Sequence, residues 1–317
     1  MKQHFVADLS LGTSVTTTFL VQDKEQRFSR TGEAYLELEL RDATGVVRGK
    51  IWDREALRAD FEKDDLVQVE GEVEEFQGAP QIRIRQVVKC TDQEVSLFDY
   101  FPRTRQDPEE LYAWLVARLR RMAEGPLRSL ALAIFDDPQI SSKYKLAPAA
   151  TSYHHAYLGG LLEHVSSLVA LGDNVCDHYP SLNRDLLIVG LVLHDLGKIE
   201  ELTYSRGFGY STRGRLLGHA VIALEIVRDK LRSLNAFPQS LRDQIEHIIL
   251  SHHGKLEWGS PKEPMFPEAL AVHYLDDLDS KLASMRAQYE ADQHLAGDWT
   301  TRNRALGREL LKKRVEG

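Results

Sequence analysis

The chain has 317 residues, with 40 Lys and Arg against 48 Asp and Glu, so its formal net charge is −8. This length is enough for more than one domain, and the acidic balance excludes a chain that binds nucleic acid over its whole surface. The longest apolar run, Leu186–Leu193, is far too short to cross a membrane. The N-terminal segment has no apolar signal-peptide core, and Cys90 and Cys176 lack CxxC spacing. We therefore expect a cytoplasmic protein without a disulfide framework.

The first hundred residues predict a β-rich domain. Leu36, Leu38 and Leu40 alternate with more polar residues, which is the period-two pattern of a half-buried strand. A short helical insert is expected over Arg54–Phe61, between the third and fourth strands. The five expected strands are Ser14–Gln22, Ala34–Arg41, Val46–Trp52, Leu66–Phe76 and Gln81–Val88.

Five short strands with a helix between the third and fourth look like an OB-fold, a small Greek-key barrel used largely for single-stranded nucleic acid. Aromatic side chains stack on bases and cations follow phosphates, so one outer face of the barrel is a candidate binding platform. Its members would be Tyr35, Arg48, Lys50, Trp52, Arg83 and Arg85. The ordinary alternative is that the tryptophan packs and the arginines face solvent. Residues 1–100 carry 13 basic and 20 acidic side chains, so binding there needs a local groove and should weaken steeply with salt.

The division into domains follows from a change of pattern near residue 100. Residues 1–91 are the expected barrel, the proline-containing segment 92–108 is the expected linker, and residues 109–317 are expected to be all helical. Helical periodicity is clear over Leu111–Phe135, with a break at Gly125-Pro126. A basic helix is predicted over Thr301–Val315.

The segment Val189–Glu201, VGLVLHDLGKIEE, ends an apolar helix abruptly in His194 and Asp195, with Lys198 one turn later. An imidazole and a carboxylate at the end of an apolar segment are costly unless both find partners. A divalent metal ion satisfies both, since neutral imidazole and carboxylate suit Mn²⁺, Fe²⁺, Zn²⁺ and Co²⁺. The pair therefore predicts a metal site, provided that the chain offers further ligands.

Other apolar helical segments contribute candidate ligands, namely His164, His219, the pair His252–His253, and Asp276. Helical bundles build metal sites from side chains on facing helices. A lone histidine in a helix more often packs or faces solvent, but apolar neighbours here leave an unpaired imidazole hard to explain. Adjacent helical residues point about 100° apart, so His252 and His253 both stay candidates. Asp276 has rivals in Asp277 and Asp279.

This order of residues, His … His-Asp … His … His … Asp, resembles the HD superfamily of metal-dependent phosphohydrolases over about residues 150–290. The resemblance implies an all-helical domain that holds two divalent ions. One ion would be held by His164, His194, Asp195 and Asp276, and the second by Asp195, His219 and His252, with His253 as an alternate or additional ligand. Mn²⁺ is the first expectation, and Fe²⁺, Co²⁺, Zn²⁺ and Ni²⁺ are alternatives.

Two divalent ions at one site predict phosphoester hydrolysis, because they clamp a phosphodiester, activate water and stabilise the attacking and leaving oxygens. Asp195 suits the bridging position, since a carboxylate offers two oxygens. Lys198 is expected to contact a phosphate oxygen during catalysis, unless it is only a solvated cation at a helix end. Arg213 and Arg215, in a glycine-rich stretch before His219, are candidates for guiding a polyanion, or else belong to a plain surface connection.

Across nearly the whole chain, a barrel followed by an HD domain resembles the YhaM family of bacterial 3′→5′ exoribonucleases. The distinctive segments are Pro148–His164, Leu191–Leu202, Gly214–His219 and Ile249–Gly254. The resemblance implies removal of 5′-mononucleotides from the 3′ end of single-stranded RNA, with single-stranded DNA as a further substrate. Two alternatives stay open: an HD phosphohydrolase of small nucleotides, and a non-enzymatic factor that binds single-stranded nucleic acid. Sequence specificity, oligomeric state and cellular targets are not determined by the sequence.

Overall fold

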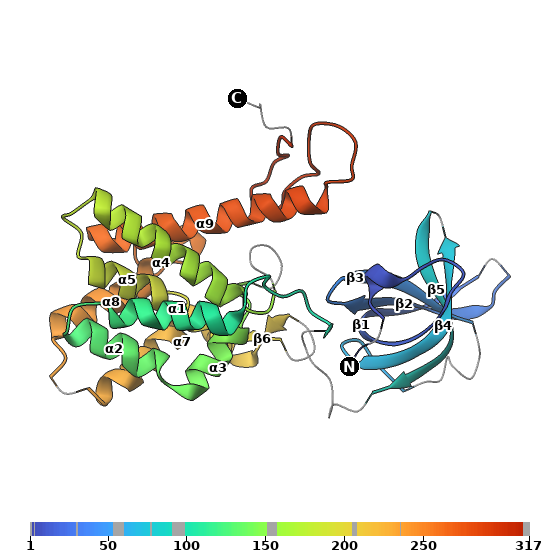
Figure 1. The fold of residues 1–317 in the computed structure, drawn as a ribbon, viewed down its shortest axis with the longest axis horizontal. Coiled ribbons are helices and arrows are strands. Elements are labelled where there is room, and N and C mark those ends of the chain that lie inside the picture. The colour runs from blue at the N-terminus through green and yellow to red at the C-terminus, as the bar shows by residue number, and fades with distance from the viewer. Residues whose placement is uncertain are drawn as a thin grey trace. The chain divides into compact units, whose positions relative to one another are not determined.

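The computed structural model describes residues 2, 4–29, 31–52, 60–76, 78–90, 99–150, 157–204, 208–234 and 236–312. These residues form two compact units, one ending at Arg103 and the other beginning at Thr104 (Figure 1). Each unit has a hydrophobic core of its own. Apart from its last two residues, the predicted helical insert Arg54–Phe61 lies outside the described residues.

The first unit contains a closed five-stranded barrel, which confirms the OB-fold prediction. Leu36, Leu38 and Leu40 are buried, as their alternation predicts. The strands hydrogen-bond in the order β1-β2-β3-β5-β4, with β3 and β5 parallel and the other pairs antiparallel. After a short 3-10 helix, Val6–Asp8, they are β1 (Ser14–Phe28), β2 (Ala34–Asp42), β3 (Gly45–Ile51), β4 (Leu66–Phe76) and β5 (Ala79–Lys89).

The second unit is helical, as predicted. Asp107 and Asp137 cap the helices that begin at Pro108 and Pro138, because their carboxylates accept hydrogen bonds from backbone N–H groups of the first turn. Two short strands, β6 (Leu202–Thr203) and β7 (Gly209–Tyr210), pair antiparallel before α7. The α-helices are α1 (Pro108–Arg120), α2 (Pro126–Phe135), α3 (Pro138–Leu146), α4 (Gly160–His178), α5 (Arg184–Leu193), α6 (Lys198–Glu201), α7 (Thr212–Arg232), α8 (Gln239–Ser251) and α9 (Pro267–Ala291).

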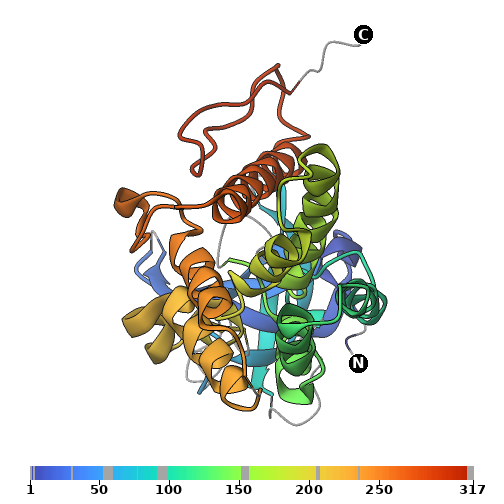
Figure 2. The same cartoon turned by 90° about the vertical axis from the view of Figure 1, so that its left-hand side faces the viewer.

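Helix α5 forms the centre of this unit. Every side chain from Leu186 to Leu193 is buried, and α5 packs against α2, α4, α8 and α9. A helix that is apolar on all sides must be covered all round, and three of the helices that cover it, α4, α8 and α9, carry or lead into candidate ligands. In Figure 2, α9 (red-orange) lies beside α4 (yellow-green). No helix among the described residues is long and apolar enough to span a bilayer.

The predicted basic helix over Thr301–Val315 is wrong as far as Lys312, where the described residues end. The chain there forms turns and isolated bridges rather than a helix. The Asn303 side chain is buried against Ser284 of α9, and its carbonyl oxygen accepts a hydrogen bond from the N–H of Leu306. Tertiary hydrogen bonds of this kind outweigh weak helical propensity.

Asp173 on α4 joins α1 to α5 through two arginines. Its carboxylate accepts hydrogen bonds from Arg118 Nε and Nη2 at 2.7 and 2.6 Å and from Arg184 Nη1 at 2.9 Å. The hydrogen bonds from Arg118 outweigh partial burial and hold the pKa of Asp173 below its usual range. We predict that Asp173→Asn lowers the unfolding free energy of the helical unit by about 1–2 kcal/mol at neutral pH. Urea unfolding followed by far-UV circular dichroism measures this.

The loss of unfolding free energy in Asp173→Asn should become smaller as the pH falls. Because the pKa of Asp173 is lower in the folded chain, its stabilisation is fully present above the unfolded pKa and is lost as the pH falls through the folded pKa. The two chains should therefore differ less near pH ~3 than at neutral pH. Asp177→Asn is the matched control, since Asp177 is 70% exposed and Arg184 is its ion-pair partner among the described residues; its expected change is below about 0.5 kcal/mol. Equal losses in both variants would contradict the prediction.

Candidate metal centre

The His-Asp pair lies where α5 ends. His194 is the C-cap of α5, and Asp195 begins the tight turn that leads into α6 at Lys198. Gly197 lets this turn approach α7 closely, because a Cβ there would lie 1.9 Å from the carbonyl oxygen of His219. A side chain at residue 197 would therefore push His219 away from the end of α5.

Four histidines, His164, His194, His219 and His252, direct the same ring nitrogen, Nε2, toward the carboxylate of Asp195. In each imidazole Nδ1 faces a carbonyl or carboxylate oxygen, so Nδ1 carries a proton and donates, and Nε2 is the nitrogen that faces the centre. The four acceptors are Asp279 Oδ2 for His164 (2.8 Å), the Leu191 carbonyl for His194 (2.9 Å), Glu201 Oε1 for His219 (3.2 Å) and the Ile249 carbonyl for His252 (2.7 Å). Fixing the other ring nitrogen in this way is how proteins orient imidazole ligands of a metal.

The Nε2 atoms surround the carboxylate of Asp195 in two groups. Asp195 Oδ2 lies 3.4 Å from His194 Nε2 and 3.9 Å from His164 Nε2. Its other oxygen, Oδ1, lies 3.5 Å from His219 Nε2 and 3.9 Å from His252 Nε2. One carboxylate therefore faces two sets of imidazoles with separate oxygens.

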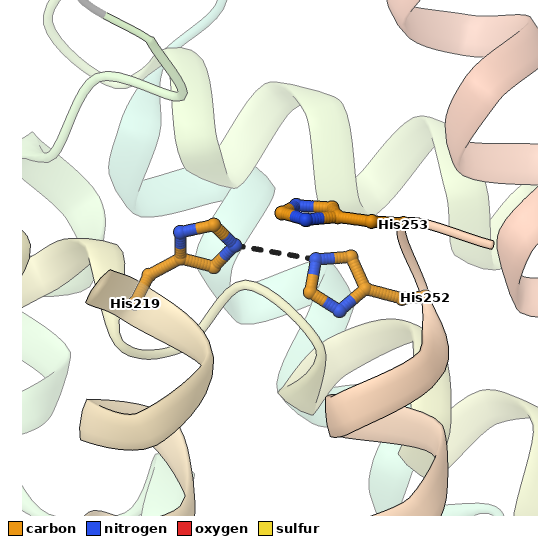
Figure 3. Close-up of side chains that lie close together, drawn as sticks. All are labelled: His219, His252 and His253. Carbon is orange, nitrogen blue, oxygen red and sulfur yellow. Dashed lines mark hydrogen bonds between the residues drawn. The ribbon is translucent and has the colours of Figure 1, made fainter. Parts of the chain in front are cut away.

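Two observations show that cations fit this arrangement. His194 Nε2 is buried and has no hydrogen-bond partner among the described residues. His219 Nε2 and His252 Nε2 are only 3.2 Å apart, along the dashed line of Figure 3, although both Nδ1 atoms already donate elsewhere. The lone pairs of these two Nε2 atoms repel each other, and a cation bound by both nitrogens would remove the repulsion. Burial lowers the pKa of His252 well below its usual range, so a proton is disfavoured there and a metal ion suits the site.

The electrostatics of the centre depend on Asp195. Burial alone would raise the pKa of this carboxyl, but the Lys198 ammonium and His194 hold it well below its usual range. Lys198 Nζ donates to Asp195 Oδ2 at 2.6 Å, and the carboxylates of Asp195 and Asp276 raise the pKa of Lys198 against the effect of burial. Burial would lower the pKa of His164, but hydrogen bonds to Asp276 and Asp279 raise it to about 9.

The structure brings the predicted ligand residues together. The potential ligand atoms of His164, His194 and Asp195 lie within 4.8 Å of one another, and so do those of His219, His252 and His253. His253 is close enough to share the second group, since its ring centroid is 4.1 Å from that of His252 and 5.1 Å from that of His219. Both histidines at the end of α8 therefore stay candidate ligands.

The three neighbouring aspartates of α9 have different surroundings. Asp276 Oδ1 lies 3.2 Å from His164 Nε2 and 3.8 Å from His194 Nε2, so it faces the ring nitrogens that point to the centre. Asp279 contacts His164 at Nδ1, on the side of the ring that faces away from the centre. Asp277 instead accepts from Lys281 on the helix surface. Of the three carboxylates, Asp276 is the one that faces the Nε2 atoms, and it stays the candidate ligand.

Sequence reasoning missed two residues that orient the centre. Glu201 accepts hydrogen bonds from the backbone N–H of His219 at 3.0 Å and from its ring. His273 donates through Nδ1 to the carbonyl of His252 at 2.7 Å. It packs on Gly254, where a Cβ would lie 2.2 Å from the His273 ring. The sequence carries one signal for His273: it precedes Asp276 by one helical turn and so shares its face.

The candidate arginines near the centre differ in their contacts. Arg213 and Arg215 lie in the first turns of α7, which is interrupted at Gly218 (φ 73°, ψ 158°) immediately before His219. Arg213 pairs with Glu225. Arg215 is exposed and forms no ion pair within the described part of the chain.

The outer face of the barrel carries an aromatic cluster. Tyr35 and Trp52 stack with ring centroids 4.5 Å apart, and Lys50 Nζ lies 4.0 Å from the ring centroid of Phe76 and 5.6 Å from that of Tyr35. Lys50 is only 9% exposed, so the predicted cation lies beneath the rings, whereas Trp52 and Phe76 are about two-fifths exposed. Phe76, at the end of β4, was not predicted as part of this face.

The predicted arginines of the barrel are all exposed. Arg83 lies opposite Lys50 in the β3–β5 register and therefore shares its face. Arg48 lies opposite Glu39, and Arg85 pairs with Glu72 at 2.9 Å.

Two family models match the chain. The model described as HD domain matches residues 161–281, and the model described as OB-fold nucleic acid binding domain matches residues 15–89. Both agree with the resemblances drawn from the sequence.

Curated relatives match over nearly the full length. The chain is 32% identical over 298 residues to the 3′-5′ exoribonuclease YhaM of Bacillus subtilis, covering 93% of each protein. The proteins of the same name from Bacillus licheniformis and Listeria monocytogenes are also 32% identical, over 307 and 280 residues, covering 96% and 88% of each protein. The chain therefore belongs to the YhaM family of 3′-5′ exoribonucleases.

Proposed function

We propose that this chain hydrolyses the phosphodiester bonds of single-stranded RNA from the 3′ end, with divalent metal ions, and releases 5′-mononucleotides. The observation that carries the proposal is the convergence of four imidazole Nε2 atoms on the two oxygens of Asp195. Together with the match to the 3′-5′ exoribonucleases YhaM, it favours phosphodiester hydrolysis. Single-stranded DNA is a second substrate in this proposal, because base stacking and phosphate contacts do not distinguish the two polymers.

We assign the ligands as two sets that share Asp195. One set is His164, His194, Asp195 and Asp276, and the other is Asp195, His219 and His252, with His253 beside them. Divalent ions held there would supply Lewis-acid polarisation of the phosphodiester and neutralise its charge. Mn²⁺ is the proposed metal, because imidazole and carboxylate ligands accept it, and Fe²⁺, Co²⁺, Zn²⁺ and Ni²⁺ are to be compared with it.

The remaining residues orient these ligands and the substrate. Asp279 and Glu201 hold the rings of His164 and His219 through Nδ1, so the ligand lone pairs are aimed before any substrate arrives. Lys198, whose ammonium is hydrogen-bonded to Asp195, is the proposed contact to a phosphate oxygen as negative charge develops. Arg215, exposed and unpaired within the described residues, is the proposed guide for the approaching polyanion.

The barrel is the proposed holder of the strand. The exposed rings of Trp52 and Phe76 offer stacking surfaces, and the Lys50 ammonium lies against the rings of Phe76 and Tyr35. Arg83 shares this face by register and is the proposed phosphate contact. This local arrangement suits a barrel with a net negative charge, because positive side chains need to attract the phosphates only where the RNA strand lies.

Removal of the shared carboxylate should abolish hydrolysis. Asp195→Ala should lower kcat/KM for RNA by more than about a hundredfold and reduce the bound metal, because both ligand sets lose a member. The measurements are stepwise shortening of 5′-labelled RNA, release of label from 3′-labelled RNA in Mn²⁺, and metal content by mass spectrometry. Asp277→Asn is the matched control, since this neighbouring carboxylate contacts Lys281 and not the centre. Undiminished shortening by Asp195→Ala, or binding of RNA by the native chain without shortening, would refute the proposal.

Lys198 should act on the rate rather than on metal binding. Lys198→Ala should lower kcat by roughly 10²–10³-fold, because a charge placed on the phosphate in the transition state is lost. Its metal content should equal that of the native chain. Loss of metal in step with activity would instead assign Lys198 a purely structural role beside Asp195.

The aromatic cluster should govern affinity for the strand. Trp52→Ala and Phe76→Ala should each weaken binding of single-stranded RNA by about tenfold, as expected for the loss of one stacking surface. Fluorescence anisotropy with a labelled oligonucleotide measures the change. Val46→Ala removes another exposed apolar side chain from β3 outside the cluster and should bind normally. Native affinity in both aromatic variants would exclude this face as the RNA platform.

A further inference from the structure

A pocket of about 550 Å³ lies between α1, α4 and α9, beside the metal centre. Trp114 of α1 and Leu282 of α9 contribute apolar walls, and Glu163, Asp279 and Arg286 contribute charged groups. This volume is in the usual range for sites that hold small organic ligands. Neither the ligand assignments nor the barrel face makes use of this pocket.

The pocket and the metal centre share a wall that is one side chain thick. Asp279 lines the pocket, and its Oδ2 accepts the Nδ1–H of His164 at 2.8 Å. On the other side of the same ring, His164 Nε2 is 3.2 Å from Asp276 Oδ1. The side chains of Asp276 and Asp279 are 20% and 14% exposed, compared with 3% for Asp195. The centre is therefore more open toward α9 than at Asp195, and a ligand in the pocket would lie close to this edge.

The groups around the pocket match the parts of a nucleoside. Trp114 is 43% exposed, so its ring offers a surface on which a base can stack. Arg286 is exposed and forms no ion pair with any described residue. The carboxylates of Glu163 and Asp279 already accept hydrogen bonds from Thr104, His164 and Ser167. They make this wall acidic, so it favours hydroxyl or amino groups and repels additional phosphate. Ser166 Oγ, also of the lining, is buried without a hydrogen-bond partner among the described residues, which is expected where a ligand or water completes the bonding.

We propose that this pocket receives the 3′-terminal nucleoside of the RNA, with its base on Trp114 and its ribose hydroxyls toward Glu163 and Asp279. This inference rests on the proposed function. In that reaction water attacks the last phosphorus, the bond from phosphorus to the O3′ of the preceding nucleotide breaks, and that O3′ leaves and takes up a proton. The terminal nucleoside keeps the phosphate through its own O5′. The base and ribose of the terminal nucleotide are attached directly to the reacting phosphate. They must therefore lie next to the metal centre, as this pocket does.

The test compares two substrates and one product. Methyl p-nitrophenyl phosphate carries only a methyl group where RNA carries the terminal nucleoside. Trp114→Ala should therefore lower the ratio of kcat/KM for RNA to kcat/KM for this diester by roughly tenfold. Equilibrium dialysis of 5′-AMP against the Mn²⁺-loaded chain should show a Kd raised by a similar factor. Trp299→Ala removes another exposed tryptophan, outside the pocket, and should change neither quantity.

A second measurement examines the acidic wall. The native chain should have a lower kcat/KM for RNA that ends in a 3′-phosphate than for RNA with a free 3′-hydroxyl. Glu163→Gln removes one negative charge from the wall and should make these two kcat/KM values more nearly equal. Equal use of the two ends by the native chain would overturn the placement of the ribose.

The possible results separate the two proposals. If the native chain does not shorten RNA, the proposed function fails, and 5′-AMP dialysis still tests the pocket. If Trp114→Ala is poorly folded, Trp114→Tyr and Trp114→Leu replace it, with 5′-AMP affinity retained by the former and weakened by the latter. Unchanged substrate ratio and unchanged 5′-AMP affinity on loss of the ring would overturn the inference.

Discussion

The carboxylate of Asp195 is the constraint on which the helical unit depends. It lies at the end of a helix that is apolar on every side, and burying such a charge without compensation costs several kcal/mol. Compensation comes from the ammonium of Lys198 and from imidazoles that reach the same point from α4, α7 and the end of α8. Each of these imidazoles is held at Nδ1 by an acceptor, so the bundle fixes their orientation before any ion or substrate enters.

Three glycines allow the backbone to bring the candidate ligands to the centre. Gly197 lets the turn after α5 lie against the carbonyl of His219, and the break in α7 at Gly218 places His219 where Glu201 accepts its backbone N–H. Gly254 leaves room for the ring of His273, which holds the carbonyl of His252. These contacts connect α6, α7, α8 and α9 around one point, so a displacement in any of them would move a candidate ligand.

The two units divide the proposed work according to their chemistry. The barrel carries a small cluster of rings over a nearly buried lysine, which suits a strand held by stacking and by a few phosphate contacts. The helical unit carries the buried centre and, beside it, a pocket whose acidic and aromatic walls suit the end of that strand. Affinity would then come mainly from the first unit and the choice of bond from the second, because only the second places a nucleoside next to the reacting phosphate.

Much of this arrangement was predictable from the sequence, and the exceptions have a common physical cause. Alternation in β2 predicted a buried leucine row, and the His-Asp pair at the end of an apolar helix predicted the centre, because both patterns express local periodicity and the cost of burying polar groups. Lys50, Phe76 and Glu201 could not be placed in this way, since their partners come from distant segments. The separate surroundings of Asp276, Asp277 and Asp279 likewise depend on which faces of α9 meet α4 and α5. The predicted C-terminal helix failed for the same reason, because the Asn303 side chain bonds to Ser284 of α9 as well as to the N–H of Leu306. The sequence by itself determined the two kinds of domain and the kind of site, whereas only the tertiary structure decided which atoms face the centre, because orientation is set by contacts between helices that sequence spacing does not contain.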